Sequence, residues 1–176
     1  MDTLFGIPTA ALIGQLVVGL INGSFYALMS LGLSIIFGLL HVVNFAHGAQ
    51  YMLGAFVAWG LLHYLGLSYW WALILAPLVV AAFGILLERT MLRHLYAVDH
   101  VYALLLTFGI SILMEGAFRL WFGVSGQPYP NPLQGGIDVG LSFLPMYRVW
   151  VILAGLAVCL VTWYFIEKTK LGAYLR

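Results

Sequence analysis

The sequence predicts an all-α, polytopic integral membrane protein. Of its 176 residues, 64% are hydrophobic and only 7% are charged, whereas about a quarter of the residues of a typical soluble domain are charged. Because so few charges cannot cover a water-exposed surface, lipid must be the solvent for most of the chain. The apolar runs are about 20 residues long, which lets a helix cross a hydrocarbon core of about 30 Å. A membrane β-barrel would instead show alternating segments of about 10 residues.

The first apolar block extends over residues 9–43 and is too long for one membrane span. Its simplest division is a crossing helix over about residues 9–29 and a shorter, re-entrant piece over about 31–41. Small residues recur at every fourth position of the crossing helix, at Gly19, Gly23 and Ala27. Such a face lets another helix approach closely.

Four further apolar blocks follow, over about residues 49–65, 69–87, 101–122 and 147–166. Tyrosines and tryptophans flank the short break between the first two of these, as in the aromatic belt at a membrane surface. A polar segment and the longest non-helical stretch separate the others, over residues 88–100 and 123–145. We therefore expect five to six transmembrane or re-entrant helices in a single transmembrane domain, residues 1–176.

The basic residues predict how the chain is oriented in the membrane. Segment 88–100 and the C-terminal tail carry five of the seven lysines and arginines. Because cytoplasmic loops are enriched in basic residues, both segments should lie in the cytoplasm. The 123–145 loop should then lie outside.

Polar residues follow the end of the first apolar block and predict a broken helix near residues 41–50. His41, Asn44, His47 and Gln50 stand in this interruption, and Asn22 precedes it. Polar groups are costly inside a membrane and usually face a cavity or a neighbouring helix. One interpretation is that they line a substrate pathway, with half-helix ends presenting N–H groups to an anionic ligand. The other is that they bond to neighbouring helices and hold the break in shape.

A second set of polar residues lies in the block at 101–122. Thr107 belongs to a mildly polar stripe of this helix, and such stripes serve helix packing more often than ligand binding. The substrate-pathway candidates are nevertheless Asn44, His47, Gln50, Asn22 and Thr107. Glu115 and Arg119 have the i,i+4 spacing, acid first, that favours an ion pair within a helix. We interpret them as a structural ion pair rather than a proton relay.

Catalytic and cofactor motifs are missing from the sequence. It has no GxSxG motif, no Walker A loop and no HExxH or His-carboxylate cluster, so we predict no catalytic residues, no metal and no cofactor. If ATP drives the protein, another subunit must hydrolyse it. The sequence also has no basic patch of the kind that binds nucleic acid.

Three motifs carry a resemblance to a known family. The first is Gly19, Gly23 and Tyr26-Ala27-Leu28, followed by Asn44-Phe45-Ala46-His47-Gly48 and Tyr51-Met52-Leu53-Gly54. The second is the run from Leu104 to Ser111, and the third is Thr169, Gly172 and Arg176. Together they resemble the LivH-type permeases of branched-chain amino acid ABC transporters, and the resemblance covers the whole chain.

The resemblance implies a membrane permease subunit of an importer for branched-chain, hydrophobic amino acids. Its expected partners are a second, LivM-like permease, cytoplasmic ATP-binding subunits and an external solute-binding protein. The expected location is the cytoplasmic membrane of a bacterium or archaeon. Family permeases continue with further helices after the third motif, so we expect the chain to be the N-terminal part of a longer permease.

Three alternatives remain open at this stage. Close relatives of the family handle urea and short-chain amides. A passive channel built from paired half-helices is a different class, although the sequence lacks the second polar interruption that such a channel would show. An intramembrane haem or redox protein is a third class.

Overall fold

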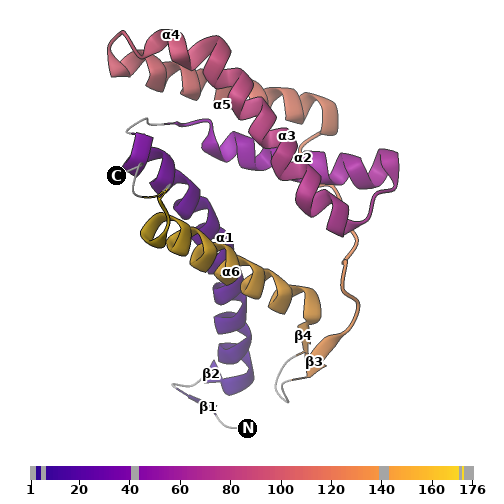
Figure 1. Ribbon diagram of the computed structural model, residues 1–176. Helices are drawn as coiled ribbons and strands as arrows, with labels where there is room; N and C mark the ends of the chain where they lie inside the picture. The colour runs from indigo at the N-terminus through magenta and orange to yellow at the C-terminus, as the bar shows by residue number, and fades with distance from the viewer. Residues whose placement is uncertain (1–2, 5–6, 41–43, 139–142, 171, 173–176) are drawn as a thin grey trace. The chain divides into compact units, whose positions relative to one another are not determined.

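The structure is a computed structural model that describes residues 3–4, 7–40, 44–138, 143–170 and 172 (Figure 1). The chain divides into two compact units. One unit comprises Met1–Gly32 and Asn131–Arg176, and the other comprises Leu33–Pro130. The boundary falls inside the first long helix.

The unit that holds both ends of the chain is built on two helices and two short strand pairs. Helix α1 spans Thr9–Leu40, of which the first part belongs to this unit, and helix α6 spans Met146–Lys168. Antiparallel strands β1 and β2 cover Thr3–Leu4 and Ile7–Pro8, and antiparallel strands β3 and β4 cover Gly136–Asp138 and Phe143–Pro145. These short pairs were not predicted from the sequence.

Helices α1 and α6 approach each other closely at Gly155. This glycine is buried on α6, and a Cβ atom placed on it would lie 3.6 Å from the Cβ atom of Ser24 and 3.7 Å from Leu28 Cδ1 on α1. The predicted close-packing residues Gly19, Gly23 and Ala27 are instead exposed in the structure. The helix pair therefore uses a different face of α1 from the one that the small-residue spacing indicated.

The second unit contains the remaining helices. Helix α2 spans His47–Leu65 and packs along α3, which spans Tyr69–Leu87 (Figure 1). Helix α3 leads into the π-helical segment η1, Glu88–Leu92, and the short helix α4, Arg93–Leu95. Helix α5, His100–Phe122, then packs against α2.

Glycine and small residues shape the packing of this unit. Helix α2 ends at Gly66, whose left-handed backbone (φ 63°) lets its N–H reach the carbonyl of Leu62 at 3.0 Å. Within the unit, the buried residues are mostly small: Ala46, Ala49, Ala72, Ala76, Ala103 and Thr107. Small side chains let helices approach when lipid rather than water surrounds them. Many large apolar side chains face outward instead, as lipid requires.

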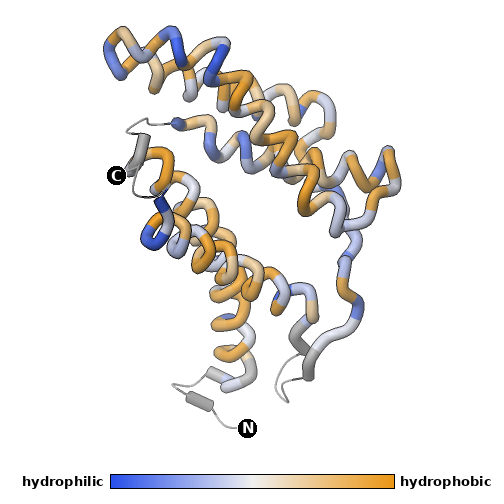
Figure 2. The backbone as a smooth tube through the Cα atoms, viewed as in Figure 1, coloured by the Kyte–Doolittle hydropathy of each residue, from blue (hydrophilic) through white to orange (hydrophobic). Residues whose placement is uncertain are grey.

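The described part of the chain confirms the all-α membrane fold. It holds four helices that are long and apolar enough to cross a membrane, over Ala11–Gly38, Tyr69–Leu95, His100–Phe122 and Met146–Lys168. Helix α2 is a fifth long helix, with 19 residues. Figure 2 shows the apolar character of these helices and the polar residues near the turn between α4 and α5.

The predicted division of the first block into two pieces is wrong. Helix α1 continues without a break for 32 residues, which is about 48 Å at 1.5 Å per residue. No proline interrupts it, and a single Gly32 costs only about 1 kcal/mol in a helix, whereas breaking a helix in lipid leaves several backbone groups without partners. The break follows α1 instead, since residues 44–46 are not helical and α2 begins at His47.

The predicted polar segment 88–100 is also mostly helical. The continuous helix that begins at Tyr69 extends to Leu95, and only residues 96–99 form the turn. Asp99 ends this turn, because its side-chain oxygen accepts a hydrogen bond from the N–H of Val101 at 3.0 Å. An aspartate in this position stabilises the start of a helix, here α5.

Candidate functional site

Thr107 is the most deeply buried polar residue that the structure describes. Only 1% of its surface is exposed, and its hydroxyl donates a hydrogen bond to the carbonyl of Leu104 at 3.0 Å within α5. The same oxygen accepts a hydrogen bond from the backbone N–H of Phe45 at 3.2 Å. One hydroxyl therefore uses both its donor and an acceptor site, which satisfies the requirement of a buried polar group.

The turn that precedes α2 is held by Asn44. Its side-chain Oδ1 accepts a hydrogen bond from the N–H of Ala46 at 2.9 Å, and its carbonyl oxygen accepts one from the N–H of His47 at 3.3 Å. Asparagine favours such turns because its short side chain bonds to the backbone two residues ahead. These two bonds hold residues 44–46 in a turn, and α2 begins after it at His47.

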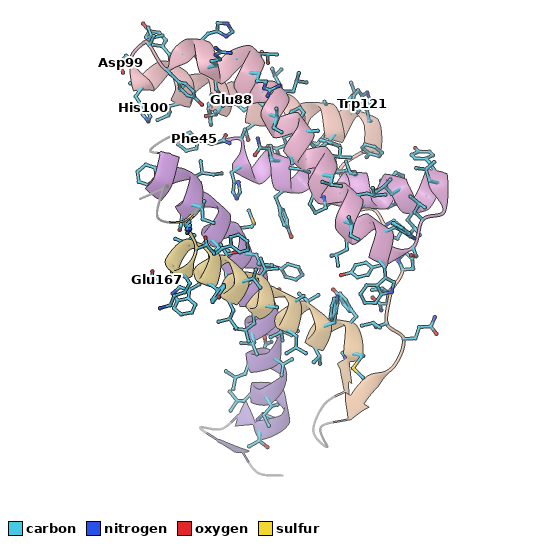
Figure 3. The ribbon with its side chains drawn as sticks, viewed as in Figure 1. Phe45, Glu88, Asp99, His100, Trp121 and Glu167 are labelled. Atoms are coloured by element: carbon cyan, nitrogen blue, oxygen red, sulfur yellow. The ribbon has the colours of Figure 1, made fainter. Side chains whose placement is uncertain are left out.

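Apolar contacts fasten the same turn to α5. The Phe45 ring, labelled in Figure 3 in the turn before α2, meets the Phe108 ring edge to face at 6.2 Å between centroids. Ala46 is completely buried, and Ala49 is 6% exposed. Ala103 and Ile110 are buried one turn before and one turn after Thr107 on α5. The turn is therefore fixed both by a hydrogen bond and by close packing.

The N–H groups at the start of α2 are largely engaged within the chain. Those of Phe45, Ala46 and His47 bond to Thr107, the Asn44 side chain and the Asn44 carbonyl. The expectation that half-helix N–H groups await an anionic ligand therefore does not hold for these three.

The other pathway candidates lie in two places. His47 and Gln50 stand half-buried in the first turn of α2, close in sequence to Asn44. Asn22 is exposed on the part of α1 that belongs to the other unit. His41 lies outside the described residues. Within its own unit, the structure therefore gathers Asn44, His47, Gln50 and Thr107 around one turn.

Glu115 and Arg119 form an ion pair on α5. Arg119 Nη2 lies 2.6 Å from Glu115 Oε1, and the two side chains are more than half exposed. The i,i+4 spacing that suggested the pair in the sequence accounts for this contact.

An aromatic cluster at the other end of α2 was not identified from the sequence. Phe56 stacks on Phe118 and on Phe122, with ring centroids 4.5 Å and 4.6 Å apart, and Trp59 stacks on His63 at 4.7 Å. In the sequence, these rings are three and four positions apart along α2 and four apart along α5, which puts them on one face of each helix. This spacing was the signal that could have predicted the cluster. The cluster joins α2 to α5 at the end opposite the Asn44 turn.

Metal-ligand clusters are absent from the described residues. No group of three or more histidine, cysteine, aspartate or glutamate side chains is placed to hold a metal ion among them. The histidines that the structure describes are spread over separate elements, at positions 47, 63, 94 and 100.

Known proteins are similar to this sequence over most of its length. The protein family described as branched-chain amino acid transport system / permease component matches residues 15–176. The chain is 31% identical, over 92% of its length, to the permease protein BraD of a high-affinity branched-chain amino acid transport system from Pseudomonas aeruginosa. It is 30% identical, again over 92% of its length, to the corresponding permease protein LivH from Escherichia coli K12.

A second type of permease is also similar to part of the chain. The permease protein LivM of the system from Salmonella typhimurium is 33% identical over 66% of the chain, which corresponds to 28% of the LivM sequence. No solved structure matches the chain. The chain spans somewhat more than half, 57%, of the length of BraD and LivH. By the match over residues 15–176, the chain belongs to the permease-component family of branched-chain amino acid transport systems.

Proposed function

We propose that the protein is a permease subunit of an ABC importer for branched-chain amino acids. In this proposal an external solute-binding protein delivers the amino acid, and cytoplasmic ATP-binding subunits supply the energy, so the chain itself is not an enzyme. A second, LivM-like permease completes the pathway in the cytoplasmic membrane of a bacterium or archaeon. The observation that carries the proposal is the family match, joined with the polar turn at Asn44–Ala46 in an otherwise apolar helical protein.

The residues around this turn have different parts in the proposed pathway. Asn44 and Thr107 already use side-chain atoms to hold the turn. We assign them the role of shaping the pathway. His47 and Gln50 are half-buried on the first turn of α2 and are the side chains proposed to meet the solute. Asn22 stays a candidate on α1.

Irregular backbone has a physical reason to lie beside a transport pathway. In lipid, non-helical backbone is tolerated only where protein buries it or where it lines a wet cavity. Transporters place substrate sites at such discontinuous helices near the middle of the bilayer. The turn is held on α5 by Phe45, whose N–H bonds to Thr107 and whose ring packs on Phe108, while about half of Phe45 remains exposed, as does Gly48.

Uptake by the complete transporter in cells tests the proposal. His47→Leu is expected to lower leucine uptake about tenfold, the effect of losing about one hydrogen bond to the solute. His63→Leu is the matched control, because His63 is on the same helix but exposed in the aromatic cluster. Both variants should reach the membrane in normal amounts. Unchanged uptake by His47→Leu would remove His47 from the pathway.

Competition identifies the class of substrate in the same assay. Unlabelled leucine, isoleucine and valine should each suppress labelled leucine uptake, and urea or acetamide should not. Suppression by urea or acetamide alone would assign the protein to the amide branch. Uptake that continues without ATP and without the binding protein would indicate a passive channel.

A further inference from the structure

The end of the helix that begins at Tyr69 carries two arginines one turn apart. Arg89 lies in η1 and Arg93 opens α4, and both are exposed. Among the residues that the structure describes, neither guanidinium has an ion-pair partner. The Glu88 carboxylate lies near the Tyr96 hydroxyl. The pKa of this hydroxyl is raised, first by burial and second by Glu88. Two positive charges therefore stand one helical turn apart, with no acidic partner in the described part of the chain.

The length of the helix places both arginines at the height of lipid headgroups. Tyr69–Leu95 has 27 residues, and its start carries the exposed Trp70 and Trp71, which are typical of a membrane interface. Arg89 lies about 30 Å further along the axis at 1.5 Å per residue, which equals the thickness of the hydrocarbon core. Arg93 lies about 6 Å beyond Arg89. If this helix crosses the bilayer with Trp70 and Trp71 at one surface, both arginines reach the headgroup layer of the opposite leaflet.

An outward apolar row leads along the helix to the arginine pair. Ile74, Leu78 and Ile85 are exposed by 58%, 60% and 54%, and their spacing puts them on one side of α3. Arg89 and Arg93 continue the same row at steps of four. Residues four apart on an α-helix are slightly more than one turn apart, so a row at this spacing gradually winds around the helix. A π-helical turn holds more residues than an α-helical turn, so η1 reduces this winding at the arginines. Figure 2 shows the change from apolar α3 to the polar residues near α4.

We propose that Arg89 and Arg93 bind the phosphate of an anionic phospholipid whose acyl chains lie along Leu78 and Ile85. A guanidinium pairs with phosphate through two parallel N–H bonds, and two guanidiniums one turn apart can share the oxygens of one headgroup. The apolar row below them matches acyl chains in height and character. An acidic protein surface would satisfy the charges but would not complement the apolar row at Ile74–Ile85. The site is independent of the amino acid that the permease carries.

Titration of the purified transporter with phosphatidylglycerol and phosphatidylcholine, followed by native mass spectrometry, tests this site. The wild type should retain phosphatidylglycerol in preference to phosphatidylcholine. The double variant Arg89→Gln/Arg93→Gln should bind phosphatidylglycerol about thirtyfold more weakly, since each basic residue near an anionic lipid surface contributes about one factor of five. If the double variant folds poorly, the single variant Arg93→Gln, at the helix end, replaces it. This variant should bind phosphatidylglycerol more weakly than the wild type, by a smaller factor than the double variant.

The matched control removes the same charge elsewhere. Lys168→Gln/Lys170→Gln alters two exposed lysines at the end of α6 and should leave phosphatidylglycerol binding near the wild-type value. An equal loss in this control would mean diffuse charge attraction and would overturn the site. Displacement of the lipid by inorganic phosphate alone would overturn it in favour of a free-phosphate site. Normal lipid binding with loss of the ATP-binding subunits from the arginine variant would assign the pair to a protein contact instead.

Discussion

The backbone N–H of Phe45 donates a hydrogen bond to Thr107 Oγ1 at 3.2 Å, across 62 positions of sequence. This bond joins the turn before α2 to the middle of α5. Thr107 can accept it because its own proton is directed to the Leu104 carbonyl. Because Thr107 is buried, the Phe45 N–H has no ready substitute partner when this bond breaks.

Removing the Thr107 hydroxyl should loosen the turn. Thr107→Val keeps the shape of the side chain but leaves the Phe45 N–H without its partner, so the free energy of unfolding should fall by about 1–3 kcal/mol. Hydrogen exchange at the Phe45 amide should accelerate accordingly. Thr107→Ser keeps the hydroxyl and should retain slow exchange.

Thr162→Val is the matched control for this experiment. The Thr162 hydroxyl bonds to the Val158 carbonyl of its own helix at 2.8 Å, so its loss leaves no donor stranded elsewhere. The stability should change by less than about 0.5 kcal/mol. If Thr107→Val left both stability and Phe45 exchange unaltered, the bond would have no structural role.

Enlarging Gly155 should separate α1 from α6. Gly155→Ala should be tolerated, because the added Cβ atom would meet Ser24 and Leu28 at ordinary contact distances. Gly155→Leu overfills the same contact and should lower the free energy of unfolding by about 1–3 kcal/mol. Thermal unfolding of the purified protein measures both effects.

Gly116→Leu serves as the control, since Gly116 is exposed and a Cβ atom there has no neighbour within 4 Å among the described residues. Equal destabilisation by Gly155→Leu and Gly116→Leu would contradict the α1–α6 contact.

Replacing Tyr129 with phenylalanine should stabilise the second unit. The hydroxyl oxygen of Tyr129 is buried and has no hydrogen-bond partner among the described residues, while its ring meets Tyr69 edge to face at 6.4 Å. An unsatisfied buried hydroxyl costs about 1–3 kcal/mol, so Tyr129→Phe should raise the free energy of unfolding by about 1 kcal/mol.

The same substitution should change the pH dependence of stability. Burial first, and the neighbouring Tyr69 second, raise the pKa of Tyr129 above its ordinary value of 10.0. The unfolded chain then loses this proton before the folded one, so the wild type keeps its full stability below the unfolded pKa and becomes less stable as the pH rises from the unfolded pKa to the folded pKa. Unfolding curves of wild type and Tyr129→Phe should therefore diverge further in alkaline buffer. Parallel curves at every pH would refute this.

Composition and spacing alone determined the class of protein and several of its local features. So few charges and apolar runs of membrane-spanning length leave helices as the solution, because every backbone group must find a partner within its own segment. The Glu115–Arg119 pair and the break at Asn44 also follow from short-range spacing. These features depend on neighbours within one or two turns, which a sequence displays directly.

Only the tertiary structure decided which distant residues meet. That Thr107 receives the Phe45 N–H, that Gly155 rather than the Gly19 and Gly23 face accepts its neighbouring helix, and that η1 continues α3 past Glu88 were not readable from the sequence. In lipid, apolar side chains do not distinguish a helix face that packs on protein from one that faces acyl chains. Helix pairing therefore depends on the fit of small residues and a few polar bonds, which exist only once the helices are placed side by side.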